Sequence, residues 1–78
     1  MADKTLDART LNCPEPIIRT RQALAAMDPG QTLRVLATDP GATLDFQAYC
    51  RISGNDLLEM VESEGVYSFL LRKTLETG

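Results

Sequence analysis

Cys13 is the residue of this chain with the clearest capacity for chemistry. It lies in the run Leu11-Asn12-Cys13-Pro14-Glu15-Pro16, where a short strand pattern gives way to a helix pattern. At a helix start, unpaired backbone N–H groups and the helix dipole favour an anion over a neutral thiol. The N–H groups of Glu15 and Ile17 are the expected donors, because the prolines have none. Since the thiolate is the nucleophilic form of cysteine, the position predicts a reactive thiol.

Charged neighbours are expected to modulate this thiol. The carboxylate of Glu15 would raise the Cys13 pKa if it faced the sulfur, so we expect it to point outward, with Arg9 or Arg19 offsetting its charge. Asp39 precedes Pro40 at the next transition from strand to helix. Strand ends of this kind meet at one edge of an α/β domain. We therefore expect Asp39 mainly to cap the second helix, and secondarily to shape the field around Cys13.

Three further residues near the two helices have simpler interpretations. Ile18 lies off the inner stripe of the first helix beside Cys13, and suits a docking surface or is an ordinary surface isoleucine. Asp45 is expected to be a solvated acid in the first half of the second helix. Cys50 lies next to the inner stripe of that helix and is assigned to packing. It should lie about 15 Å along the helix axis from the level of Cys13, too far for a disulfide.

The alternative for Cys13 itself is an inert cap or a small buried apolar residue, which is how most cysteines behave. The paired prolines, the position at a strand end and the lack of another catalytic group favour a functional role.

Composition narrows the possible chemistry. The chain has 78 residues, two cysteines, no histidine and a net charge of -3. Two cysteines without histidine are too few for a structural zinc site, and a Cys–His pair is impossible within the chain, so we expect neither a metal nor a cofactor. The acidic balance disfavours direct binding of nucleic acid. No apolar run is long enough to span a bilayer, so we expect a cytoplasmic protein that does not bind membranes.

The pattern along the chain predicts six elements. Strands are expected over residues 5–9, 32–37, 56–62 and 66–73, and helices over 14–27 and 40–52. The order β-α-β-α-β-β predicts an α/β (α+β) two-layer sandwich, with two helices on one face of a four-stranded mixed sheet. Residues 1–78 are expected to form a single domain with flexible ends at 1–3 and 74–78. Some apolar side chains of the last two strands should lie on the bare face of the sheet.

The chain resembles the TusA/SirA family of small sulfur-carrier proteins over nearly its whole length. The resemblance rests on these features: Leu6-Asp7-Ala8, the C-P-x-P motif Cys13-Pro14-Glu15-Pro16, Asp39-Pro40, Asp45, Tyr49-Cys50 and the closing run 69–73. It implies the same β-α-β-α-β-β fold. It also implies that Cys13 accepts a sulfane sulfur as a persulfide, with Pro14, Glu15 and Pro16 as supporting motif residues.

The same resemblance implies partners. The donor would be a cysteine desulfurase or a rhodanese, and the acceptor a DsrE-like or other sulfur-relay protein. The relay would lead toward 2-thiouridine in tRNA or to other sulfur trafficking. Such a protein is a sulfurtransferase-like carrier that works with partner enzymes. Persulfide transfer is thiol exchange, so it requires neither a metal nor a general base.

Other functions remain open from the sequence alone. The main alternative is a non-catalytic interaction or regulatory module that docks through Ile18 and the bare sheet face. Direct nucleic-acid binding is disfavoured by the net charge. A thiol–disulfide reductase is the least favoured class, because no resolving cysteine is near Cys13 in the sequence.

Overall fold

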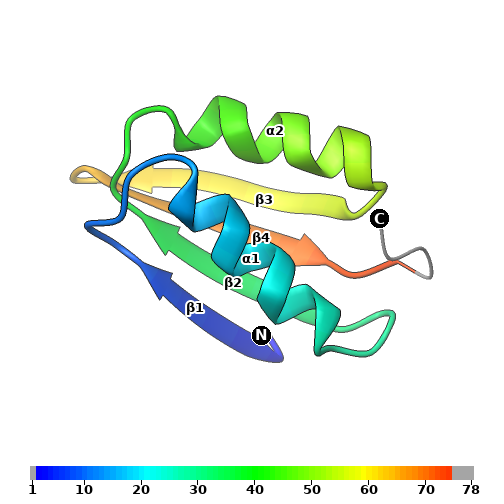
Figure 1. Cartoon of the computed structure of the whole chain (residues 1–78). Helices are drawn as coiled ribbons and strands as arrows, with labels where there is room; N and C mark the ends of the chain where they lie inside the picture. The colour runs from blue at the N-terminus through cyan, green and yellow to red at the C-terminus, as the bar shows by residue number, and fades with distance from the viewer. Residues whose placement is uncertain (1, 75–78) are drawn as a thin grey trace.

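Four strands and two helices form two layers in the computed structural model, which describes residues 2–74. The elements are β1 (Lys4–Ala8), α1 (Glu15–Ala25), β2 (Thr32–Ala37), α2 (Ala42–Ser53), β3 (Asp56–Ser63) and β4 (Val66–Arg72). The strand order is β1-β2-β4-β3, with β1 parallel to β2 and β4 antiparallel to both of its neighbours. Both helices lie on the same face of the sheet (Figure 1). The predicted α/β two-layer sandwich is confirmed.

The core lies between the helices and the sheet. In β2, Leu33, Val35 and Ala37 are buried and alternate with half-buried residues, as expected for a strand with one covered face. Phe69 of β4 stacks on Phe46 of α2, with 4.4 Å between the ring centroids. These two rings are fully buried and are the largest side chains in the core, so they fix α2 over the centre of the sheet.

Both helices begin later than the prolines indicated. The helix expected from Pro14 begins at Glu15, and Pro14 occupies the N-cap position with φ of -100°. The helix expected from Pro40 begins at Ala42, with Gly41 at the N-cap position. The backbone carbonyl of Asp39 accepts the N–H of Ala42 at 2.9 Å, so a turn containing Pro40 precedes the helix. Proline is compatible with such a turn as well as with the first helical position.

Cys50 was predicted to lie next to the inner stripe of the second helix, but it lies on that stripe. Ala42, Phe46 and Cys50 form the buried stripe of α2, at spacings of four residues. The neighbouring Tyr49 is only half-buried. Cys50 is therefore a core residue rather than a neighbour of the core.

The open face of the sheet, which the helices do not cover, combines ion pairs with apolar side chains. Arg34 of β2 pairs with Glu59 of β3 at 3.2 Å, and Arg72 of β4 pairs with Asp56 at 2.6 Å. Leu70 lies opposite Arg34 in the sheet register, so it is on the open face while Leu71 is buried. Apolar exposure on this face is thus confirmed, but charged pairs flank it.

The ends of the described chain are hydrogen-bonded. Asp3 exchanges hydrogen bonds with Thr32 at the start of β2, and the N–H of Thr74 donates to Asn55. Residue 1 and residues 75–78, which belong to the termini predicted to be flexible, lie outside the described residues.

Candidate functional site

The loops that follow β1 and β2 are hydrogen-bonded to each other at one edge of the sheet. Because β1 and β2 are parallel neighbours, Ala8 and Ala37 pair at their carboxyl ends and the two loops leave side by side. The Thr10 N–H donates to the Thr38 hydroxyl at 2.9 Å. Thr10 has φ of 71°, a left-handed conformation that is unfavourable for a β-branched residue. The contact with Thr38 therefore holds a strained backbone just before the motif that contains Cys13.

Asp39 fixes the backbone of Cys13. Its Oδ2 accepts the Cys13 N–H at 2.9 Å, and its Oδ1 accepts the Gly41 N–H at 3.1 Å. The expectation that Asp39 caps α2 is wrong in detail, because no side chain caps the start of that helix. The secondary expectation, a role around Cys13, matches the observed contact. Asp39 thus joins the Cys13 loop to the loop that leads into α2.

Cys13 is exposed and opens onto a groove between the two helices. The groove is a hollow of about 510 Å³. Pro14 and Ile17 line it from the α1 side, and Asp45, Ala48 and Ile52 line it from α2. Ile52 is 85% exposed, so the rim of this groove is apolar as well as open. A thiol in this position is accessible to a partner that covers the groove.

The electrostatics of Cys13 differ from the expectation. Asp45 raises the pKa of the exposed Cys13 thiol by accepting a hydrogen bond from it, and desolvation and the negative charges of Asp45 and Asp39 raise it further. The helix dipole does not prevail, because α1 begins two residues later and the Glu15 N–H donates to the Asn12 carbonyl at 2.8 Å. These negative charges favour the protonated form of the Cys13 thiol in the isolated protein. Asp45, expected to be a solvated acid, belongs to this site.

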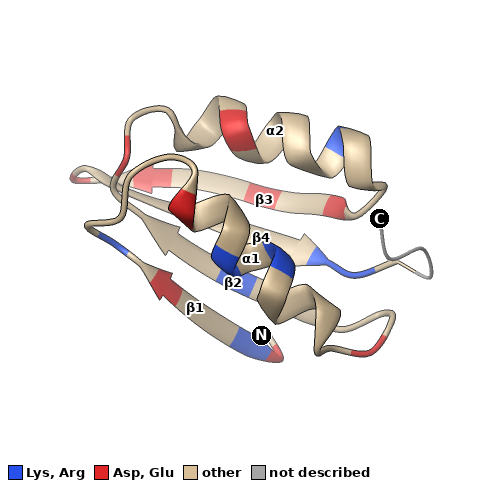
Figure 2. Ribbon diagram, in the orientation of Figure 1, with Lys and Arg blue, Asp and Glu red and all other residues tan. Residues whose placement is uncertain are grey.

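The two arginines expected to offset the charge of Glu15 are each paired with a carboxylate. Arg19 pairs with Glu15 at 3.5 Å, which is one of the two pairings expected to offset the charge of Glu15. Arg9 instead pairs with Asp7 at 2.8 Å and holds the pKa of that carboxyl at about 2. The expected role of Arg9 beside Glu15 is therefore not observed. Figure 2 shows acidic segments at the beginning of α1, in the first half of α2 and in the loop before α2.

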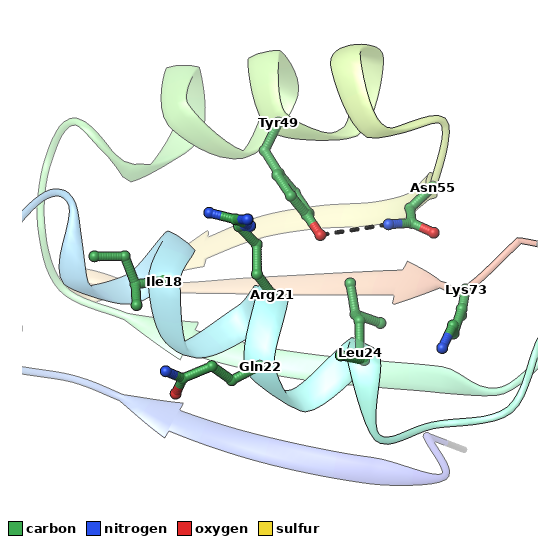
Figure 3. Close-up of a pocket in the computed structure, with 8 residues that line it drawn as sticks. Ile18, Arg21, Gln22, Leu24, Tyr49, Asn55 and Lys73 are labelled. Carbon is green, nitrogen blue, oxygen red and sulfur yellow. Dashed lines mark hydrogen bonds between the residues drawn. The ribbon is translucent and has the colours of Figure 1, made fainter. Parts of the chain in front are cut away.

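Ile18 belongs to a second hollow, farther along the same inter-helical groove. It is 37% exposed, as expected for a surface residue, but it does not line the hollow that contains Cys13. The second hollow has a volume of about 340 Å³ and extends to Asn55 and Lys73 (Figure 3). Arg21 and Tyr49 line both hollows, so they form the boundary between them.

Cys50 has none of the accessibility of Cys13. Its side chain is 7% exposed, and burial raises the pKa of its thiol to about 11. Both cysteines are free thiols. The assignment of Cys50 to packing agrees with this environment.

Residues 2–74 contain neither a cluster of metal-ligating side chains nor a helix that could cross a membrane. No group of three or more His, Cys, Asp or Glu side chains is placed to hold a metal ion there. In the same part of the chain, no helix combines the length and the apolar character needed to cross a bilayer.

Comparison with known proteins identifies the family. A family model described as sulfurtransferase TusA matches residues 4–73. The chain belongs to the TusA family. The sulfur carrier protein TusA of Allochromatium vinosum is 49% identical over 72 residues, which cover 92% of this chain and 95% of that protein. A protein of Neisseria meningitidis serogroup A is 47% identical over 72 residues, covering 92% and 97% of the two chains.

A solved structure supports the TusA-family fold. The crystal structure of a SirA-like protein from Desulfitobacterium hafniense superposes with a TM-score of 0.79 at 27% identity, covering 91% of this chain and 97% of that one. A family of sulfur carriers acts with sulfur-relay partners. The groove at Cys13 exposes both a thiol and apolar side chains.

Asp45, Arg21 and Tyr49 line the groove, although the sequence analysis gave none of them a role at this site. Asp45 is in the first turn of α2, and α2 begins at the same edge of the domain as Cys13. That combination of position and charge was a usable signal. Arg21 and Tyr49 face each other from two different helices, and only their packing brings them together.

Proposed function

We propose that this chain is a sulfur carrier that accepts a sulfane sulfur on Cys13, holds it as a persulfide and relays it to an acceptor protein. The observation that carries the proposal is the contrast between an exposed Cys13 in an inter-helical groove and a buried Cys50. In the chemistry of the proposal, the Cys13 thiolate attacks the outer sulfur of a donor persulfide and the donor thiolate leaves.

The proposed donor is a cysteine desulfurase or a rhodanese, and the proposed acceptor is a DsrE-like or other sulfur-relay protein in the cytoplasm. Family membership supports a relay role. The route toward 2-thiouridine in tRNA, rather than another branch of sulfur trafficking, is part of this proposal. The carrier itself is proposed to need no cofactor and no direct contact with nucleic acid.

Intact-mass spectrometry after incubation with a cysteine desulfurase and cysteine tests the proposal. We expect wild type and Cys50→Ser to gain one sulfur atom that a reductant removes, and Cys13→Ser to gain none. The two serine variants are matched controls, because each removes one thiol. Sulfur gain by Cys13→Ser, or no gain by wild type with either a desulfurase or a rhodanese, would overturn the assignment.

The interaction-module alternative makes a different prediction. Ile18 is exposed and lines the second hollow, so docking through that surface does not require a sulfur atom. Partner binding that persists in Cys13→Ala, without sulfur gain by the wild type, would favour that alternative.

A further inference from the structure

Asp45 carries an uncompensated negative charge beside the Cys13 thiol. The ion pairs found among residues 2–74 occupy four other carboxylates: Asp7, Glu15, Asp56 and Glu59. Asp39, the other carboxylate near Cys13, uses both oxygens to accept backbone N–H groups. Asp45 has no cationic partner within the described chain, although it is half-buried in the groove wall.

The cation that lines the same hollow as Asp45 is not paired with it. Arg21 lines the same hollow but forms no ion pair with any carboxylate among the described residues. Its side chain extends toward Tyr49, on the boundary with the second hollow (Figure 3). Glu15, at the start of α1, is held by Arg19. The charged groups around Cys13 therefore leave one carboxylate free to act on the thiol.

Asp45 and Cys13 line the same hollow, so the carboxylate disfavours the thiolate. Its negative charge opposes loss of the proton from the thiol and raises the pKa of Cys13. The isolated protein thus holds a sulfur that is protected at rest.

We propose that Asp45 is a positioning residue that holds Cys13 in a protonated resting state, and that a Lys or Arg side chain of the sulfur donor releases it by pairing with Asp45. This inference rests on the proposed function and adds a requirement for the partner: a cation must reach the groove wall next to the motif. The exposed apolar rim at Ile52 supplies the surrounding contact area.

The transfer step balances without another reagent. When the partner's cation pairs with Asp45, the Cys13 proton passes to solvent and the Sγ becomes a thiolate. The thiolate attacks the outer sulfur of the donor persulfide, so a new S–S bond forms on Cys13 as the donor's S–S bond breaks. The donor sulfur leaves with the electron pair and takes up a proton. The sum is one thiol and one persulfide giving one persulfide and one thiol.

The first test measures the thiol in the isolated carrier. The rate of Cys13 alkylation by iodoacetamide is followed against pH by peptide mass spectrometry, for wild type, Asp45→Asn and Asp28→Asn. Asp28 is exposed in the turn after α1, so its variant makes the same charge change away from the groove. We expect only Asp45→Asn to move the midpoint to lower pH, with alkylation about three- to tenfold faster near neutral pH.

The second test measures loading from a cysteine desulfurase. Although it has more thiolate, Asp45→Asn should load sulfur about tenfold more slowly than wild type, because the donor's cation has lost its partner. Asp45→Glu, which keeps the charge, should recover part of the rate. If Asp45 only opposed ionisation of the thiol, both alkylation and loading would be faster in Asp45→Asn. A folding defect would be visible by circular dichroism and would also affect Asp45→Glu.

The outcomes separate this inference from the proposed function. Suppose that wild type loads sulfur on Cys13. If Asp45→Asn is then alkylated at the wild-type rate, or loads sulfur at the wild-type rate or faster, the role of Asp45 is overturned and the carrier function stands. If wild type takes up no sulfur on Cys13, the carrier function fails and the donor-release step fails with it, whatever the alkylation profile.

Discussion

Two cysteines in one small chain have opposite environments, and this contrast sets their chemistry. Cys13 is exposed at the mouth of a groove, whereas Cys50 is packed in the stripe of α2 that faces the sheet. Burial raises the pKa of Cys50 to about 11, so this thiol is neither ionised nor reachable near neutral pH. The Cys13 pKa is also raised, but chiefly by the Asp45 carboxylate, which stands beside an exposed thiol.

At the residue scale, replacing Asp39 should loosen the Cys13 loop. Asp39→Ala removes acceptors for the N–H groups of both Cys13 and Gly41, and we expect a loss of about 1–2 kcal/mol in the free energy of unfolding. Urea denaturation measures that loss, and amide hydrogen exchange should show the Cys13 N–H losing protection. Asp39→Asn, which retains one acceptor oxygen, is the matched control. Unchanged exchange at Cys13 in the alanine variant would contradict this role.

At the scale of elements, the β3–β4 hairpin has an unfavourable residue in its turn. Glu64 and Gly65 both have positive φ, at 51° and 82°, as a two-residue turn of type I′ requires. Glycine adopts this conformation freely, whereas glutamate does so at a cost.

Glu64→Asn should therefore stabilise the protein. Asparagine tolerates the left-handed conformation, so we expect a gain of about 0.5–1 kcal/mol in the free energy of unfolding. Glu64→Gln is the control, because it removes the same charge without favouring that conformation. Equal gains for the two variants, measured by urea denaturation, would attribute the effect to charge instead.

β3 is an edge strand of the sheet, and two of its features oppose pairing with the edge of another molecule. The register of β3 against β4 shifts between Leu57 and Glu59, which marks a bulge, and acidic residues recur along the strand at Asp56, Glu59 and Glu62. Bulges and like charges on an edge strand oppose pairing with a second copy of the same edge. The apolar residues of β3 therefore do not by themselves indicate self-association.

At the scale of the whole molecule, the end opposite Cys13 is held together by Lys73. This buried side chain donates to the Met27 carbonyl at 2.6 Å, and its backbone exchanges hydrogen bonds with Gly30 and Gln31. These contacts join the end of β4 to the turn between α1 and β2. The domain is thus closed at one end by Lys73, while the other end presents the Cys13 groove.

Lys73→Met should destabilise the fold and leave sulfur chemistry in place. Loss of the bond to a buried carbonyl should lower the free energy of unfolding by about 1–3 kcal/mol. Arg51→Met, which removes an exposed cation from the last turn of α2, should change it by at most about 0.5 kcal/mol. Both variants should gain sulfur on Cys13 when folded. Equal stability of the two variants would contradict the structural role of Lys73.

The sequence by itself determined the order of the elements and the identity of the candidate thiol. Alternation in residues 32–37 and the Glu64-Gly65 turn are local signals, and local signals follow from the geometry of a single strand or turn. The strand-to-helix transition around Cys13 is local in the same sense.

Only the tertiary structure decided the environment of that thiol. A pKa depends on which charges lie within a few ångströms, and Asp45 reaches Cys13 from a different element. Asp39 similarly changed from a helix cap to a support for the Cys13 backbone, because its partner lies 26 residues away in the chain. The sequence marked where α1 would begin, but the packing of α2 against it determined whether the sulfur there is ionised.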